Sequence, residues 1–150
     1  MAVRDGVEGL SEDELMGTIT LIFVAGFITT STLIGNGLVA LARHPGETDR
    51  LWTQPGLVPG AVEEMLRYDA PAQFDRTVLA DTEVNGRALP AGRGVVVLPG
   101  AANRDPGPFP DPDRFDLSRR DAHLHLSFAW GLHHCLGASP ASQRRWCSKP

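Results

Sequence analysis

The sequence has few cysteines, no excess of positive charge and no recognisable export signal. Its 150 residues include two cysteines, Cys135 and Cys147, whose settings differ too much to indicate a disulfide pair. The 14 basic residues are outnumbered by 18 acidic ones, which argues against nucleic acid as a partner. The first residues lack the charged and then apolar order of a signal peptide, and no internal repeat is present. Length and composition therefore predict one globular domain in a reducing compartment.

Charged residues are also absent from the stretch between Leu15 and Ala42. By length this stretch can cross a membrane, and a small membrane protein spanning residues 15–42 is one alternative. Ser11 and Glu14 have the spacing of a capping box, and threonines recur in the stretch, so we predict a long helix ending near Arg43. At roughly 1.5 Å per residue it is too long for a chain of this size to cover well. It is typical of the central helix of a larger soluble protein.

A single sulfur, that of Cys135, lies between glycines in the segment from Phe128 to Gly137, called the cysteine segment below. Gly131 and Gly137 allow tight bends and close approach of the backbone to a flat partner. An axial thiolate is one way in which proteins hold heme iron. An idle thiol and a zinc-binding module remain alternatives, although the ligands lack the paired spacing of structural zinc sites. The candidate zinc ligands are His123, His125, His133, His134 and Cys135.

A second helix is predicted from Leu57 to Tyr68, with Pro59 in its first turn. Glu64 and Arg67 are three residues apart and would be neighbours on its surface. Both fall away from the apolar stripe, so the pattern alone predicts an exposed ion pair.

Later segments indicate a small β part. Asn85-Gly86 predicts a tight hairpin, and the β-branched run from Val95 to Leu98 predicts a strand. The segment from Asp105 to Phe115 is too rich in proline for regular structure, so we expect a packed loop there.

Patterns in four segments, taken in order, resemble those of the heme-thiolate monooxygenases, the cytochrome P-450 superfamily. They are Ala25-Gly26-Phe27-Ile28-Thr29-Thr30, Glu64-Met65-Leu66-Arg67, Pro112-Asp113-Arg114-Phe115 and the cysteine segment, which matches at Phe128, Gly131, His133, Cys135 and Gly137. Two positions depart from the family's patterns. Ala129 replaces a usual glycine, and Ile28 replaces a usual acid and cannot relay protons.

The resemblance implies a mainly α fold with a small β part, the C-terminal portion of the cytochrome P-450 fold, holding heme b (iron protoporphyrin IX). In such a fold Cys135 ligates the iron and Thr29 assists oxygen activation. Ala25 and Gly26 leave room beside the heme for a diatomic ligand. Arg76 and His133 hold the propionates.

The resemblance also implies a structural cluster and a reaction. Glu64, Arg67 and Arg114 would form a buried, fully paired group. The expected reaction inserts one atom of O₂ into a small organic substrate, with electrons from a ferredoxin-type donor, in the cytoplasm and away from membranes. Residues 1–138 would form a partial domain whose activity alone is an open question. Pro140 disfavours the helix expected after Cys135, and a shifted reading frame could encode it, so we hypothesise a frameshift at 139–150.

Overall fold

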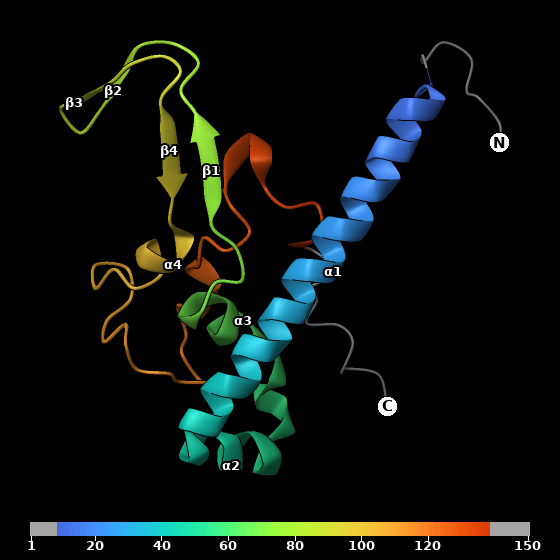
Figure 1. Cartoon of the computed structure of the whole chain (residues 1–150). Helices are drawn as coiled ribbons and strands as arrows, with labels where there is room; N and C mark the ends of the chain where they lie inside the picture. Colours follow the sequence, from blue (N-terminus) through green and yellow to red (C-terminus); the bar gives the residue numbers. More distant parts are fainter. Residues whose placement is uncertain (1–8, 139–150) are drawn as a thin grey trace.

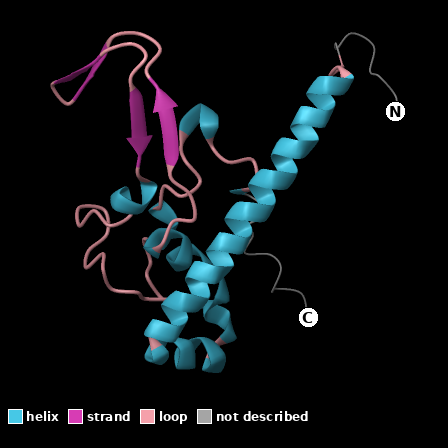
Figure 2. Cartoon of the chain, in the orientation of Figure 1, coloured by secondary structure: helices cyan, strands magenta, loops and turns pink. Residues whose placement is uncertain are grey.

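The computed structural model describes residues 9–138, in which a long helix runs along one side of a body of short elements (Figure 1). The predicted tail, 139–150, lies outside these residues. The helices are α1 (Glu12–Arg43), α2 (Pro45–Thr53), α3 (Val58–Tyr68) and α4 (Pro99–Ala102), with 3₁₀ turns η1 (Pro55–Leu57), η2 (Ala122–Leu124) and η3 (Gly131–His133). The strands are β1 (Phe74–Thr77), β2 (Thr82–Val84), β3 (Arg87–Leu89) and β4 (Gly94–Val97). Figure 2 shows how much of the rest is loop. The predicted mainly α fold with a small β part is confirmed.

Helix α1 begins and ends where the sequence predicts. The Glu14 N–H donates to Oγ of Ser11 at 3.3 Å, and the Ser11 N–H donates to Oε2 of Glu14 at 2.8 Å, which completes the capping box. The Ser11 N–H and the Ser11 hydroxyl both donate to Oε2 of Glu14, and these two hydrogen bonds hold the pKa of the exposed Glu14 carboxyl below its ordinary value. The helix ends at Arg43, where His44 caps it and Pro45 starts the next helix.

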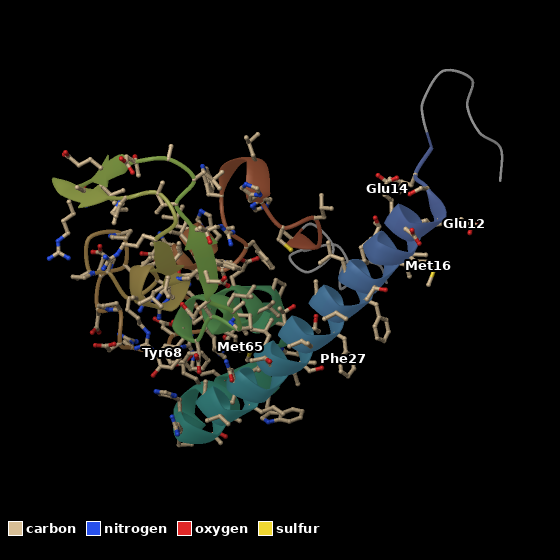
Figure 3. All side chains as sticks on the ribbon, turned by 45° about the horizontal axis from the view of Figure 1, so that its top comes forward. Glu12, Glu14, Met16, Phe27, Met65 and Tyr68 are labelled. Atoms are coloured by element: carbon tan, nitrogen blue, oxygen red, sulfur yellow. The ribbon has the colours of Figure 1, made fainter. Side chains whose placement is uncertain are left out.

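Only the C-terminal part of α1 packs against the body. Gly37 and Ala40 are its buried residues, and a methyl group at Gly37 would lie 2.6 Å from Sδ of Met65 on α3. Figure 3 shows Met65 on the packed side of α1, whereas Phe27 and Met16 point away from the body. The core beside this contact is small and consists of Ala40, Ala61, Phe115 and Leu117, with Leu41, Leu51, Met65 and Tyr68 packed around it.

The N-terminal part of α1 leaves its apolar side chains in the open. By length and composition α1 is apolar enough to cross a membrane, and none of its most apolar window is buried. The central helix of a soluble protein has the same composition, so this property does not separate the two alternatives.

The strands form two antiparallel pairs. β1 pairs with β4 in the register Phe74 to Val97, and β2 pairs with β3 in the register Val84 to Arg87. Asn85 and Gly86 connect β2 to β3 with φ of 49° and 75°, the left-handed conformation that a tight hairpin requires. The hairpin prediction is confirmed. The predicted strand at 95–98 is shifted by one residue, and the segment 105–115 contains no helix or strand, as expected.

Candidate active site

Glu64 and Arg67 on α3 form an ion pair that is fully buried. Nε of Arg67 donates to Oε2 of Glu64 at 2.7 Å, and Nη2 donates to Oε1 at 2.9 Å. The other guanidinium hydrogens go to the backbone carbonyls of Asn103 and Pro112 at 2.9 Å and of Arg114 at 3.3 Å. The five N–H groups of an arginine are thereby all used. Burial of this charge is tolerated because it is paired and completely hydrogen-bonded.

The exposed pair predicted from the helical pattern alone is therefore wrong, and the burial implied by the family resemblance is what the structure has. The proline-rich segment 105–115 covers this side of α3. The ring of Phe109 lies 5.5 Å from the guanidinium carbon of Arg67. The periodicity of a helix cannot reveal that a distant loop will cover its polar side.

The third member of the cluster is Arg119, and the prediction of Arg114 is corrected. Nε of Arg119 lies 3.3 Å from Oε1 of Glu64, and its side chain is 8% exposed. The other nitrogens of Arg119 donate to backbone carbonyls of residues 110–114. The guanidinium of Arg114 is 62% exposed and lies 3.6 Å from Asp116. Arg114 contributes only its backbone carbonyl to the cluster.

A tight turn after Phe115 brings Arg119 to the cluster. Phe115 and Leu117 are buried, whereas Ser118 is exposed. The Arg119 N–H donates to the carbonyl of Asp116 at 3.0 Å, which closes a turn over Leu117 and Ser118. The choice of Arg119 over Arg114 depends on this turn, which no spacing in the sequence indicated.

The backbone of the cysteine segment closes on itself. The Cys135 N–H donates to the carbonyl of Phe128 at 2.9 Å, and the Ala129 N–H donates to the carbonyl of Leu126 at 2.9 Å. Gly131 has φ of 71°, a left-handed conformation that glycine adopts freely. Ala129 has φ of 57°, and a residue with a Cβ atom in this conformation costs about 1–2 kcal/mol. The departure from glycine at Ala129 is therefore a strained one.

A single pocket brings together the predicted cofactor residues that come from distant parts of the chain. Its walls come from α1, α3, the loop before β1, β1 itself and the cysteine segment. The predicted residues that line it are Ala25, Thr29, Arg76, Phe128, His133 and Cys135. Among residues 9–138, no carboxylate side chain lines this pocket.

The three predicted glycines lie beside the pocket and do not line it. A methyl group at Gly26 would meet no atom within 4 Å, so this face of α1 is open. A methyl group at Gly137 would lie 3.6 Å from Sγ of Cys135, an ordinary contact distance. Gly131 serves the backbone through its left-handed conformation.

The threonine predicted to assist oxygen activation lies on the wall that α1 contributes. Oγ1 of Thr29 donates to the carbonyl of Ala25 at 2.7 Å, so its oxygen lone pairs remain available to a donor in the pocket. Ile28 is exposed and has no group that can carry a proton. Thr30 also lines the pocket and adds a second hydroxyl.

Two basic side chains border the same pocket. Arg76 on β1 uses Nη1 to donate to the carbonyl of Asp75 at 2.7 Å, and its guanidinium carbon lies 5.6 Å from the ring centroid of Phe74. His133 in η3 lines this pocket and also an adjoining one that Arg76 shares. An arginine and a histidine on one rim can bind a carboxylate through charge-assisted hydrogen bonds.

The late histidines do not form a zinc site in the described part of the chain. Within residues 9–138, no group of three or more histidine, cysteine, aspartate or glutamate side chains is arranged to hold a metal ion. Nε2 of His125 lies 3.3 Å from Oε2 of Glu63, close enough for an ion pair, but the contact is not a hydrogen bond. This geometry disfavours the zinc-binding alternative.

Comparison with known proteins places these features in one family. The family model described as Cytochrome P450 matches residues 56–143, more than half of the chain. The 6-deoxyerythronolide B hydroxylase of Saccharopolyspora erythraea is 44% identical over 90% of this chain and 34% of its own length. The cytochrome P450 monooxygenase PikC of Streptomyces venezuelae is 44% identical over 86% of this chain and 31% of its own. The chain thus spans about a third of the length of these relatives.

Solved structures agree with the sequence comparisons. The structure of cytochrome P450 CYP109Q5 from Chondromyces apiculatus has a TM-score of 0.87 and 42% identity, covering 94% of this chain and 36% of that one. P450BioI, solved in complex with a fatty-acyl-ligated acyl carrier protein, has a TM-score of 0.82 and 42% identity, covering 89% and 35%. Family model, identity and fold lead to one conclusion: the chain belongs to the cytochrome P450 family.

Proposed function

We propose that the protein containing this chain is a heme-dependent monooxygenase, in which Cys135 is the iron ligand. The observation that supports this most is the convergence of Cys135, Arg76, His133 and Thr29 on one pocket, although they come from three separate parts of the chain, namely α1, β1 and the cysteine segment. Two relatives of this chain are named hydroxylase and monooxygenase.

The residues around the pocket suit a flat, iron-containing group with carboxylate arms. Cys135 offers one exposed sulfur, and a thiolate is an established axial ligand of heme iron. Arg76 and His133 offer donors for propionates, and no carboxylate among the described lining residues would repel them. Leu33 and Leu66 contribute apolar side chains to the wall of the pocket. Heme, when bound, supplies the oxygen chemistry that no side chain can perform.

The chain's own residues would hold the sulfur in place, accept a hydrogen bond in the pocket and supply protons. The closed backbone around Cys135 fixes the sulfur, because its N–H is tied to the carbonyl of Phe128. The hydroxyl of Thr29 can accept a hydrogen bond from a donor in the pocket while it donates to Ala25. With Ile28 beside it, proton supply at this wall depends on hydroxyls and water. The buried cluster of Glu64, Arg67 and Arg119 braces α3 against the loop that leads to the cysteine segment.

Substrate, electron donor and location are proposed for the whole protein. The substrate is a small organic molecule. Among the similar proteins, one is named for hydroxylation of 6-deoxyerythronolide B, and one is bound to an acyl carrier protein. We propose a ferredoxin-type electron donor and a soluble, cytoplasmic protein, in which α1 is a core helix.

The test is an absorption spectrum of the chain after reconstitution with heme, reduction and exposure to carbon monoxide. A red-shifted Soret band is expected, since thiolate ligation produces it. Cys135→Ser should abolish the red shift, whereas Cys147→Ser should retain it as the matched control. A parent chain without the red-shifted band, or one in which Cys135→Ser keeps it, contradicts the proposal.

A further inference from the structure

We infer that Asn103 is a positioning residue that fixes the cysteine segment, and so the sulfur of Cys135, onto the buried cluster of α3. The link to heme rests on the proposed function, whereas the link between Asn103 and the Cys135 backbone does not. The inference comes from the hydrogen bonds around two buried polar residues, Asn103 and Ser127.

Asn103 uses every polar group of its side chain in the protein interior. It follows α4 directly and is fully buried. Its Nδ2 donates to Oγ of Ser127 at 2.9 Å, and its Oδ1 accepts the N–H of Leu126 at 2.8 Å. Its backbone carbonyl accepts from Nη1 of Arg67 at 2.9 Å. One residue therefore contacts both the buried ion pair and the chain just before the cysteine segment.

Ser127 extends this connection to α3. Its hydroxyl donates to the carbonyl of Leu66 at 2.6 Å, and its N–H donates to Nδ1 of His125 at 3.2 Å. Because the single hydroxyl hydrogen of Ser127 goes to Leu66, its oxygen is free only to accept. The amide of Asn103 supplies the matching donor. The serine is 8% exposed, so water has little access to replace that donor.

The connection continues to the sulfur-bearing residue through the backbone. The carbonyl of Leu126 accepts from the Ala129 N–H, and the carbonyl of Phe128 accepts from the Cys135 N–H. Leu126 is thus held on one side by Asn103 and on the other by Ala129. A displacement of Leu126 and Ser127 would move the carbonyl to which the Cys135 backbone is tied.

Asparagine has the required donor and acceptor at this length whatever the pH. Leucine offers neither donor nor acceptor, and ionised aspartate offers no donor for Ser127. Glutamine carries the same amide one methylene further, and Asn103 is fully buried, so the longer side chain would displace the amide from its partners. A buried group left without its partner is expensive, so loss of the amide should release the segment.

The first measurement needs no heme and follows backbone amide exchange in the full chain. In Asn103→Leu, protection of the Leu126, Ser127 and Cys135 amides should fall about tenfold, the loss expected when a net hydrogen bond is removed. Amides of the β1–β4 pair should keep their protection. Asn36→Leu is the matched control, since the side-chain amide of Asn36 also donates a hydrogen bond, to the carbonyl of Asp69, but in another place. Unchanged protection at Cys135 in Asn103→Leu overturns the inference.

The second measurement uses the heme-loaded chain and Asn103→Asp. The protonated acid of this variant can donate to Ser127 and accept from Leu126 as the amide does, but the ionised acid cannot donate. The red-shifted fraction of the carbon monoxide complex, relative to the parent at the same pH, should therefore rise as the pH falls. A ratio that does not change with pH overturns the inference, also in the case where Asn103→Leu fails to fold. A parent without the red-shifted band contradicts the heme assignment alone, because the amide exchange still decides the role of Asn103.

Discussion

The N-terminal part of α1 and the region around α3 satisfy their side chains in opposite ways. Around α3, charged groups are buried and each finds partners within the described residues, as Arg67 does with Glu64 and three carbonyls. Along the N-terminal part of α1, apolar side chains such as Phe27, which is 64% exposed, are largely uncovered. The polar region is thus complete within the described residues, whereas the apolar side chains of the helix lack a cover there.

The comparison also bears on the membrane alternative. Composition and length alone allow α1 to cross a membrane. The chain belongs to the cytochrome P450 family and spans about a third of the length of its relatives. Both facts favour a core helix instead. Thr29 on this helix faces a pocket shared with the cysteine segment, which is an expected arrangement for a helix inside a protein.

The largest effect on stability should come from disrupting the buried ion pair of the region around α3. Arg67→Ala leaves Glu64 buried with less compensation and removes the guanidinium donors of the Asn103 and Pro112 carbonyls, so the free energy of unfolding should fall by about 3–5 kcal/mol. Chemical denaturation measures this loss. Heme uptake should be lost as well, and a variant that takes up heme normally would contradict the bracing role.

A smaller effect should distinguish the two arginines that compete for the third place in the cluster. Arg119→Ala should lower the free energy of unfolding by about 2 kcal/mol, since hydrogen bonds to a charged group each contribute roughly 1.5–3 kcal/mol. Arg114→Ala, with its exposed guanidinium and its carbonyl retained, should change it by less than about 0.5 kcal/mol. Equal losses in the two variants would restore Arg114 as the third member.

The border between the regions can be located with two glycines of α1. Gly35 is exposed with no atom near its missing methyl, so Gly35→Ala should stabilise the helix by about 1 kcal/mol. Gly37→Ala should lack this gain, because the new methyl would lie 2.6 Å from Sδ of Met65. Thermal unfolding compares the pair, and equal gains would mean that Met65 moves aside without cost.

The smallest effect is expected in the cysteine segment, which shares its pocket with both regions. Ala129→Gly should stabilise the chain by about 0.5–1 kcal/mol, because relief of the left-handed strain exceeds the entropy of the added glycine. Gly94→Ala is the reverse substitution at a position without left-handed strain, because Gly94 has an ordinary strand conformation with open space around it. Destabilisation by Ala129→Gly would mean that the methyl group makes contacts worth more than the strain.

Local chemistry predicted the parts of the fold that are determined locally. Ser11 and Glu14 cap their own helix, and Asn85-Gly86 builds its own turn, so neighbouring residues suffice to predict both. The burial of Glu64 depends on a loop that arrives from far along the chain, and no periodicity contains that information. The family resemblance supplied it, but the resembling segment contains Arg114, whose side chain is exposed. Arg119 reaches the cluster instead, after a turn that the resemblance did not indicate.

The same limit explains what was missed in the candidate site. The hydrogen bonds of Asn103 and Ser127 arise only where three segments distant in sequence meet, so no local pattern could reveal them. Six residues of the pocket were predicted, because each belongs to a short pattern to which the family resemblance gives a role. The strain at Ala129 needed the backbone angle, which the sequence could only suggest as a departure from glycine.

Arg67 and Arg119 hold the loop of residues 110–114 almost entirely by its main-chain oxygens. Every amino acid carries such an oxygen, proline included, whereas only a long, multiply donating cation can reach several at once. Substitutions within the loop should therefore be well tolerated as long as its path is kept. The conformation of this loop is therefore determined by two residues outside it, Arg67 and Arg119, and few other amino acids could replace them.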